Sequence, residues 1–378
     1  MPTKLISTGP LKKNIYTPNV PLPTEAEVLN ALSQIQDPDL HRDIVSLGMI
    51  KDIKIGDDGV VDFTFELTTP ACPVRDQFQT LARQYAGALP GVTDVRVKMT
   101  ANVRPAFLQR DNSQLLPGVK QTIAVASGKG GVGKSTVAVN LAAALSLAGA
   151  KVGLLDADIY GPSIPAMLGI HRPPVVENEK LIPLEAHGLK LMSIGFLAGA
   201  DKAMVWRGPM VSRAIQQMLG DVIWGELDYL VVDLPPGTGD SSLTLAQTIA
   251  LSGVVIVATP QDVSLDIAVK ALQMFRTLNV TPLGLVENMS YYVCQNCGHE
   301  AHIFNHGTGE KTAEKLGVPF LGSVPLEEGI REDADLGAPV VVTRPDSNGA
   351  AAFRAIASKV AAQTSIRSFR QLPVINVR

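Results

Sequence analysis

Cysteine, long apolar runs and an excess of charge of one sign are all scarce in this 378-residue sequence. Three cysteines, an odd number, cannot form a framework of disulfides, so we expect a reducing compartment, the cytoplasm. A formal net charge of −3 offers no basic field that would gather nucleic acid, and we expect no nucleic-acid partner. No window contains the roughly 18 uninterrupted apolar residues of a membrane span, so we expect no membrane partner either.

What the sequence does contain is the composition of an ordinary globular protein, with 46% hydrophobic and 18% charged residues. Its length allows two domains. Changes of pattern along the chain predict five segments. They are a proline-punctuated N-terminal tail (1–23), a small α+β domain (24–103), a linker (104–120), a larger α/β domain (121–365) and a C-terminal tail (366–378).

The small domain is predicted from two helical and three extended patterns. Thr24 and Glu27 have the spacing of a capping box, which predicts a helix that begins there. Residues 49–67, "MIKDIKIGDDGVVDFTFEL", alternate apolar and polar residues around the turn signal "GDDG", which predicts a β-hairpin. Residues 72–89 fit a second helix, and residues 92–99 fit a third strand.

The larger domain is predicted from short apolar runs that alternate with helical stretches. Strands as uniformly apolar as these are buried on both faces, as in parallel sheets flanked by helices. We therefore predict a doubly wound, mainly parallel α/β sheet preceded by the small α+β domain. The runs are "TIAVAS", "KVGLLDAD", "DYLVVDLPPG", "GVVIVATP", "PLGLVEN" and "FLGSVP".

A glycine-rich loop, "SGKGGVGKST", lies between the first of these runs and the first helical stretch. Gly128, Gly133, Lys134 and Ser135 match the P-loop pattern in the strand–loop–helix context that it requires. Such a loop binds phosphates through backbone amides and the helix N-terminus, while Lys134 reaches the β- and γ-phosphates and Ser135 binds Mg²⁺. ATP and Mg²⁺ are thus the expected cofactors. The predicted nucleotide-binding loop comprises Gly128, Lys129, Gly130, Gly131, Val132, Gly133, Lys134, Ser135 and Thr136.

A second lysine, Lys129, follows the first glycine of this loop. Two lysines held near each other repel unless an anion lies between them. The pattern "GKGGVGKS" resembles the deviant Walker A family of P-loop ATPases. That resemblance implies a homodimer in which Lys129 reaches the partner's nucleotide and stabilises its charge.

Three acidic residues follow strands of the predicted sheet, at the edge where open α/β sheets bind ligands. Asp233 ends an apolar run and suits the Walker B role of holding Mg²⁺. The family resemblance implies that Asp158 orients the attacking water, so that Lys129, Lys134 and Asp158 are the catalytic candidates. Asp156 is either a supporting or a purely structural residue. Asn288 matches the family position that contacts the adenine base.

Further motifs distinguish among the relatives. The stretches "DADIYGPSIPAMLG", "WRGPM", "DYLVVDLPPGTGD" and "ENMSYYVCQNCG" together resemble the Mrp/ApbC family of iron–sulfur cluster carriers. Likewise, "DPDLHRDIVSLGMI" and "TTPACP" resemble the MIP18-like domain that often precedes such ATPases. The resemblance implies an ATPase that binds an iron–sulfur cluster transiently, receives it from cluster donors and delivers it to apo client proteins.

The cysteine pair Cys294 and Cys297 is the candidate cluster site. A 4Fe–4S cluster usually takes four thiolates, and a twofold dimer would supply two from each chain. We expect a 4Fe–4S cluster there, and the sequence leaves a 2Fe–2S cluster open. The alternatives are a zinc site with His299 and His302, a zinc ion bridging the dimer, and redox use of the pair. Those two histidines and His306 are expected at the surface instead. Cys72 has no assigned role.

Two other functions are considered for the same fold. A spatial-positioning ATPase acting on a membrane or DNA would need a basic amphipathic terminal helix or a basic surface. The C-terminal stretch has a few arginines but is interrupted by Pro373. An electron-transfer reductase related to the nitrogenase iron protein would take its cluster cysteines from separate loops. Neither alternative accounts for Cys294 and Cys297 as a close pair.

Overall fold

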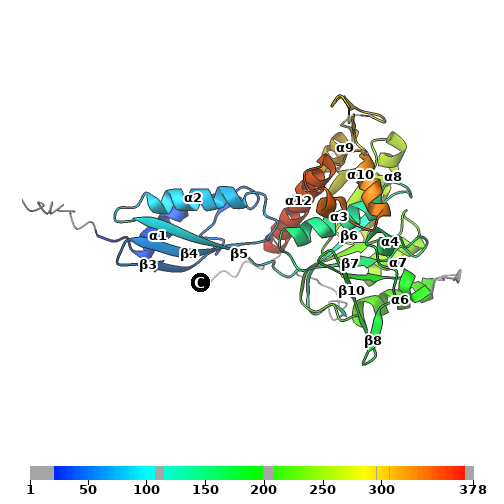
Figure 1. Ribbon diagram of the computed structural model, residues 1–378, viewed down its shortest axis with the longest axis horizontal. Coiled ribbons are helices and arrows are strands. Elements are labelled where there is room, and N and C mark those ends of the chain that lie inside the picture. Colours follow the sequence, from blue (N-terminus) through cyan, green and yellow to red (C-terminus); the bar gives the residue numbers. More distant parts are fainter. Residues whose placement is uncertain (1–20, 107–114, 199–207, 295, 306, 371–378) are drawn as a thin grey trace, which may run out of the picture. The chain divides into compact units, whose positions relative to one another are not determined.

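The computed structural model of the chain describes residues 21–106, 115–198, 208–294, 296–305 and 307–370. By their contacts these residues form two compact units (Figure 1). The first unit comprises the described residues up to Glu66 together with Arg75–Thr100, and the second comprises Leu67–Val74 and the described residues from Ala101 onward. The loop Leu67–Val74 thus belongs to the second unit, although it lies inside the predicted small domain.

The first unit is an α+β fold with the predicted helices and strands. Thr24 caps its first helix, and both hydrogen bonds of the capping box with Glu27 are present. The predicted hairpin is confirmed, since its two strands pair antiparallel around residues 56–59. The elements are α1 (Glu25–Leu32), β1 (Gln36–Asp37), β2 (Arg42–Asp43), β3 (Ile50–Ile55), β4 (Val60–Leu67), α2 (Arg75–Gly87) and β5 (Asp94–Ala101), with sheet order β3-β4-β5.

The core of this unit lies between the helices and one face of the sheet. Val28 and Leu32 of α1 are fully buried. Phe65 of β4 stacks on Phe78 of α2, with ring centroids 5.3 Å apart. From Val61 to Leu67 of β4, buried and half-buried residues alternate, which is the period of two that the sequence pattern indicated.

The second unit is built on an eight-stranded sheet in the order β10-β11-β7-β12-β6-β13-β14-β17. Seven of these strands run parallel, and only the edge strand β10 is antiparallel to its neighbour. The doubly wound sheet predicted from the six apolar runs is therefore confirmed. The strands are β6 (Val119–Ser127), β7 (Val152–Asp156), β10 (Leu184–Ala186), β11 (Leu189–Ser193), β12 (Leu227–Asp233), β13 (Gly253–Ala258), β14 (Pro282–Glu287) and β17 (Phe320–Ser323).

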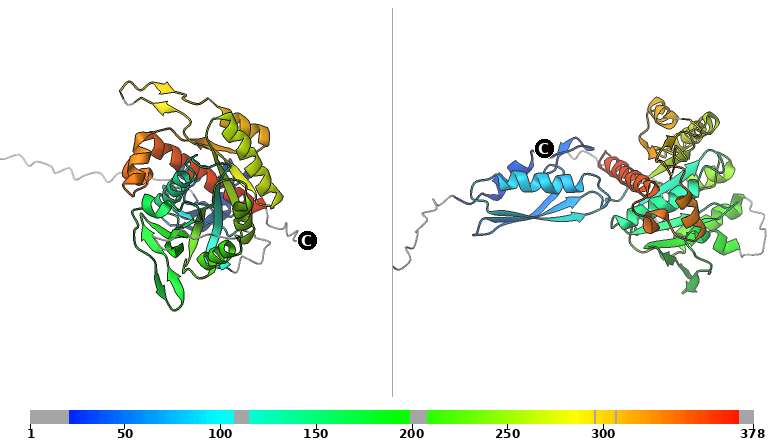
Figure 2. Two further views of the ribbon diagram at one scale, coloured as in Figure 1. Left: turned by 90° about the vertical axis from the view of Figure 1, so that its right-hand side faces the viewer. Right: turned by 45° about the horizontal axis from the view of Figure 1, so that its top comes forward.

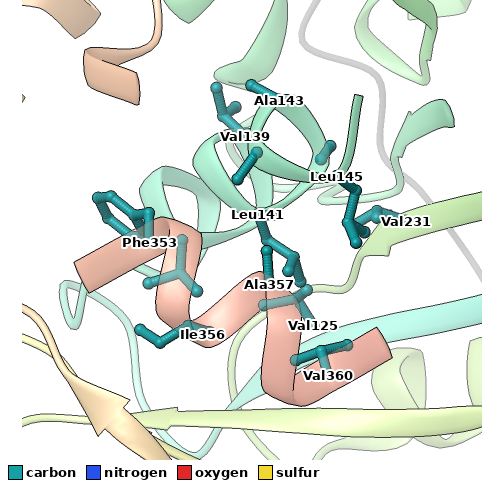
Figure 3. Close-up of a cluster of buried hydrophobic side chains, with 14 of the residues drawn as sticks. Val125, Val139, Leu141, Ala143, Leu145, Val231, Phe353, Ile356, Ala357 and Val360 are labelled. Carbon is teal, nitrogen blue, oxygen red and sulfur yellow. The ribbon is translucent and has the colours of Figure 1, made fainter. Parts of the chain in front are cut away.

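Helices cover both faces of this sheet, and successive residues of a central strand enter different cores. In β6, Ile123 and Val125 pack with α3 (Lys134–Leu147) and α12 (Asn348–Arg370). Figure 3 shows side chains of both helices meeting over Val125 and Val231. The alternate residues Ala124 and Ala126 pack on the opposite face with α6 (Gly208–Gly220), α7 (Asp240–Thr248) and α8 (Asp262–Thr277). Burial on both faces is the reason why these strands are so uniformly apolar.

Smaller elements complete the second unit. Two hairpins extend from its body, β8 (Val175–Glu177) with β9 (Lys180–Ile182) and β15 (Tyr292–Val293) with β16 (Glu300–Ala301). The remaining helices are α4 (Ile164–Met167), α5 (Gly195–Ala198), α9 (Thr308–Leu316), α10 (Glu328–Asp335) and α11 (Val340–Thr343). Among the described residues no helix combines the length and apolar character needed to cross a membrane.

Two parts of this unit were not predicted correctly. The edge strands β10 and β11 were missed, because the stretch that contains them lacks the alternation of apolar runs with helices. The C-terminal tail was expected to begin at residue 366, but α12 continues to Arg370. Its last turn is held to the body of the unit, since Ser368 accepts a hydrogen bond from Gln121 and Arg367 donates one to the carbonyl of Ser252.

Candidate functional site

The glycine-rich loop connects β6 to α3 at the carboxyl edge of the sheet. Gly131 and Gly133 both adopt the left-handed conformation, with φ of 79°. A Cβ atom on Gly133 would lie 2.2 Å from the side-chain nitrogen of Asn288, so glycine is required there for space as well as for conformation. The backbone amides at the start of α3 carry the partial positive charge that binds anions.

The Lys134 side chain lies among carboxylates at the base of this loop and is only 6% exposed. Its ammonium group is 2.7 Å from Oδ1 of Asp233 and 3.4 Å from Oδ2 of Asp158. The hydroxyl of Ser135 donates to Oδ2 of Asp233 over 2.6 Å. The structure thus brings together four of the predicted site residues from three separate parts of the chain.

The carboxylates of this cluster have perturbed acidities. Burial raises the pKa of Asp233, which is fully enclosed, while the ammonium group of Lys134 acts in the opposite direction. Burial and the nearby charge of Asp233 raise the pKa of Asp156 to about 7. These shifts follow from placing two neighbouring strand-end acids, aligned in register on β7 and β12, where water does not reach them.

Asp156 holds the loop that carries Asp158. Its Oδ1 accepts a hydrogen bond from the backbone amide of Asp158 over 3.1 Å. Its Oδ2 accepts from the amide of Ile164, at the start of α4, and from the hydroxyl of Ser193. The sequence left open whether Asp156 is a supporting or a purely structural residue. Its hydrogen bond to the backbone of Asp158 favours the supporting role.

A cavity of about 510 Å³ opens beside the loop. Part of this lining gave no signal in the sequence beyond its position after a strand. It consists of seven residues from the segment after β17 at the carboxyl edge: Pro325, Leu326, Glu327, Ile330, Arg331, Ala334 and Asp335. The lining residues are Gly133, Thr136, Ser163, Ala166, Met167, Asn288, Met289, Pro325, Leu326, Glu327, Ile330, Arg331, Ala334 and Asp335. A lining that mixes apolar side chains with a few polar ones beside a phosphate loop has the character of a nucleoside pocket.

Asn288 lines this cavity and also contacts the loop directly. Its side-chain amide donates to the carbonyl of Val132 over 2.8 Å. The predicted contact with an adenine base stays a prediction. Lys129 is half-buried, and its ammonium group donates to Oε1 of Gln261 over 3.2 Å. Its predicted reach to a partner's nucleotide likewise stays a prediction.

Cys294 and Cys297 lie at the turn of the hairpin β15–β16, which Figure 2 shows in gold, standing out from the unit. Cys294 is half-buried and Cys297 is exposed. Two backbone hydrogen bonds close the turn, from Cys294 to His299 and from Gly298 to Cys294. Hydrogen bonds from the backbone and thiol of Cys297 lower the pKa of Cys294, which favours the thiolate that binds metals.

The alternatives for this cysteine pair fare differently. His299 and His302 are exposed, as expected, while His306 lies outside the described residues. Within the described ranges no group of three or more His, Cys, Asp or Glu side chains is placed to hold a metal ion. The pair lies in a hairpin turn and not at a helix N-terminus, so the geometry of a thioredoxin-like redox pair is missing.

Of the motif "WRGPM", the first two residues lie outside the described residues.

Strand, loop and helix are arranged here as in P-loop NTPases, and the fold and site define that class. The model of the NUBPL iron-transfer P-loop NTPase family matches residues 118–361, and that of the iron–sulfur cluster assembly protein family matches residues 25–99. The chain belongs to the family of iron-transfer P-loop NTPases and carries the assembly-type domain in front. The family predicted from the motifs is confirmed.

Individual proteins agree with this assignment. An iron–sulfur cluster carrier protein of Deinococcus radiodurans is 51% identical over 348 residues, which cover 92% of this chain and 97% of that protein. A nucleotide-binding protein from Archaeoglobus fulgidus, solved in complex with ADP, is 40% identical with a TM-score of 0.56, covering 63% of this chain and 93% of that one. The cell division ATPase MinD of Pyrococcus furiosus, 23% identical over 64% of this chain and 98% of that one with a TM-score of 0.50, shares the fold.

Proposed function

We propose that this chain binds and hydrolyses ATP as a homodimer, carries an iron–sulfur cluster between the two copies and delivers it to apoproteins. The observation that carries the proposal is the position of Cys294 and Cys297 on an exposed turn of the unit that holds the phosphate loop. A 4Fe–4S cluster takes four thiolates, and one chain offers two at this turn. In a homodimer with its twofold axis beside the hairpins, the partner chain supplies the other two thiolates.

The nucleotide part of the proposal rests on the loop and the cavity beside it. Phosphates bind to the amides between Gly128 and Thr136, and the nucleoside occupies the cavity lined by Asn288. The hydroxyl of Ser135 and the carboxylate of Asp233 are adjacent oxygen donors of the kind that Mg²⁺ prefers. The ADP bound by the Archaeoglobus relative supports this assignment.

Hydrolysis is assigned to three side chains around the phosphates. Lys134 exchanges part of its contact with Asp233 and Asp158 for the phosphate oxygens, and Asp158 is then released to orient the attacking water. Lys129 leaves Gln261 and neutralises charge on the nucleotide of the partner chain. Mg²⁺, when bound, withdraws electron density from the transferred phosphoryl group.

The cargo and its partners follow from the family and from the hairpin. The relative in Deinococcus radiodurans is an iron–sulfur cluster carrier by name, which supports the same cargo here. Apo client proteins and cluster donors would meet the dimer at the exposed turn. The cytoplasmic location expected from the scarcity of cysteine stays a prediction. No observation favours the membrane or DNA alternative, since the likeness to MinD is one of fold.

Anaerobic reconstitution with iron and sulfide tests the cluster site. The wild-type chain should take up about four iron atoms per dimer with the visible absorbance of a 4Fe–4S cluster. Cys294→Ala should lose that cluster, and Cys72→Ser is the matched control that should keep it. If Cys294→Ala retained the same absorbance and the same iron per dimer, the proposed site would be wrong.

ATP turnover tests the role of the second lysine. Lys129→Ala should lower turnover by at least tenfold, since one charge on a transferred phosphoryl group contributes about 10³ or more in comparable sites. Sedimentation with ATP checks whether the variant still dimerises. A variant that dimerises and hydrolyses ATP as fast as the wild type would refute the action across the dimer.

A further inference from the structure

A five-residue segment, Glu287–Tyr291, touches both the nucleotide cavity and the cysteine hairpin. It begins at the carboxyl end of β14 and leads directly into β15. At its centre Met289 adopts the left-handed conformation, with φ of 56°, which is uncommon for a residue with a long side chain. The surrounding structure therefore holds this turn in a defined shape.

Three contacts join this segment to the nucleotide site. The side chain of Asn288 donates to the carbonyl of Val132 in the phosphate loop. The neighbouring Met289 lines the cavity. Leu326, another lining residue of the cavity, is tied to the same segment, because its amide donates to the carbonyl of Tyr291 over 2.7 Å.

Glu287 connects the segment that precedes the cysteine hairpin to the helix α9 that follows it. Its carboxylate is buried, with the residue 1% exposed. Oε1 accepts a hydrogen bond from the hydroxyl of Ser290, just before the hairpin, over 2.6 Å. Oε2 accepts one from the amide of Gly309, in the first turn of α9, the next helix after the hairpin, also over 2.6 Å. One carboxylate thus holds the chain where it leaves the sheet and where it returns.

The packing around this carboxylate is tight, whereas the hairpin beyond it is open. A Cβ atom on Gly309 would lie 2.5 Å from Oε2 of Glu287. By contrast, Cys297, Ile303 and Phe304 are all exposed. A hairpin held at its base and exposed at its turn changes position when its base moves.

We propose that Glu287 is a positioning residue that transmits the nucleotide state to Cys294 and Cys297. The proposal rests on the proposed function, since it describes how nucleotide would regulate the cluster site. A nucleotide that enters the cavity changes the contacts of Asn288 and Met289, and the rigid segment passes the displacement to the chain on both sides of the hairpin through the carboxylate. As a result, the exposure of each of the two thiols is different in the ATP-bound and the ADP-bound chain.

Alkylation of the cysteines in the metal-free, full-length chain tests this coupling without any cluster. Rates at Cys294 and Cys297 are measured by peptide mass spectrometry with saturating Mg·ADP or a slowly hydrolysed Mg·ATP analogue. In the wild type, the alkylation rate of each cysteine should differ by at least about fivefold between the two nucleotide states, which is the lower end of typical coupling between sites. In Glu287→Gln, which keeps the size but cannot accept both hydrogen bonds, the difference should fall below about twofold while nucleotide affinity stays within threefold.

Asp333→Asn is the matched control. Asp333 is also a buried carboxylate, 4% exposed, and it joins two helices through Thr343 and Arg344 without contacting the hairpin. This variant should keep the full nucleotide response. If Glu287→Gln fails to fold, Ser290→Ala decides, because it removes only one of the two hydrogen bonds and should reduce the response by about half.

The outcomes separate this proposal from the proposed function. Three results would overturn the proposed coupling. They are wild-type alkylation rates that do not depend on the nucleotide, a full nucleotide response in Glu287→Gln, and an equal loss of the response in Asp333→Asn. None of these results affects cluster binding by Cys294 and Cys297, which reconstitution measures. A nucleotide-dependent response in a chain that takes up no cluster would support the coupling and refute the carrier function.

Discussion

Replacing Lys134 by methionine measures how strongly its ammonium group stabilises the carboxylates around it. Methionine has nearly the same length and keeps the apolar packing of the side chain, but it has no charge. The change leaves Asp233 fully buried with Ser135 as its remaining hydrogen-bond donor, and it removes the cation 3.4 Å from Asp158. The variant should therefore lose stability in the absence of nucleotide as well as affinity for phosphates.

The magnitude follows from the burial of the pair. Removing one partner of a buried ion pair costs about 3–5 kcal/mol, because the remaining charge is neither hydrated nor compensated. For a unit of this size each kcal/mol lowers the melting temperature by about 2–4 °C, so Lys134→Met should melt at least about 6 °C below the wild type. Calorimetry with a chelator present and nucleotide absent provides the measurement.

The deficit should also depend on pH. Burial already raises the pKa of Asp233, and losing Lys134 removes the main opposing influence, so the pKa rises further. A raised carboxyl pKa means that the folded state holds a proton that the unfolded chain has released, and the free energy of unfolding then falls as pH rises. The deficit of Lys134→Met should be large near about pH 8 and small near about pH 5.

A second substitution tests the assigned cause. In Lys134→Met/Asp233→Asn the buried position carries no charge, so most of the lost stability should return, although phosphate affinity should not. The reasoning would be refuted if the single variant melted within about 2 °C of the wild type near pH 8, or if the double variant recovered nothing.

Three further predictions concern single positions. The carboxyl pKa of Asp156 is raised from 3.8 to about 7, so the free energy of unfolding should fall by about 4 kcal/mol as pH rises across that interval. Asp156→Asn should flatten the pH dependence of the free energy of unfolding, measured by denaturant titration. An unchanged slope would show that Asp156 is not the group that titrates. Gly133→Ala forces a Cβ atom against Asn288 at a left-handed position, so ADP affinity measured by calorimetry should fall at least tenfold, and wild-type affinity would contradict the tight approach. Thr24→Ala removes the capping box with Glu27 and should cost the first unit about 1 kcal/mol by chemical denaturation, whereas Thr24→Ser should cost little.

Much of the fold could be predicted because its signals are local. The capping box at Thr24 and the hairpin at residues 49–67 depend on residues only a few positions apart, and both are present. The six apolar runs form parallel strands of the sheet. They could be predicted because a strand that is buried on both faces is apolar along its whole length. The edge strands β10 and β11 carried no such signal, since their pairing depends on a sheet formed by distant residues.

The candidate site divides in the same way. The phosphate loop could be recognised from its sequence, because its glycines and its lysine act within ten residues of one another. The contacts of Asp156 could not, since one of them comes from Ser193 on the missed strand β11. The cavity beside the loop was only partly indicated, through the position of Asn288 after a strand, because the rest of its lining includes residues of the segment after β17 and of α10.

By itself the sequence determined the class of the protein, its two-part organisation and the identity of its phosphate-binding and cysteine motifs. Only the tertiary structure decided how these motifs meet. Lys134 and Asp233 are 99 positions apart and join in one ion pair. Glu287 joins the residue before the cysteine hairpin strands to the helix that follows them, beside a side chain that contacts the phosphate loop. Contacts of this kind depend on where parallel strands place their carboxyl ends, which follows from the assembled sheet and not from any short stretch of sequence.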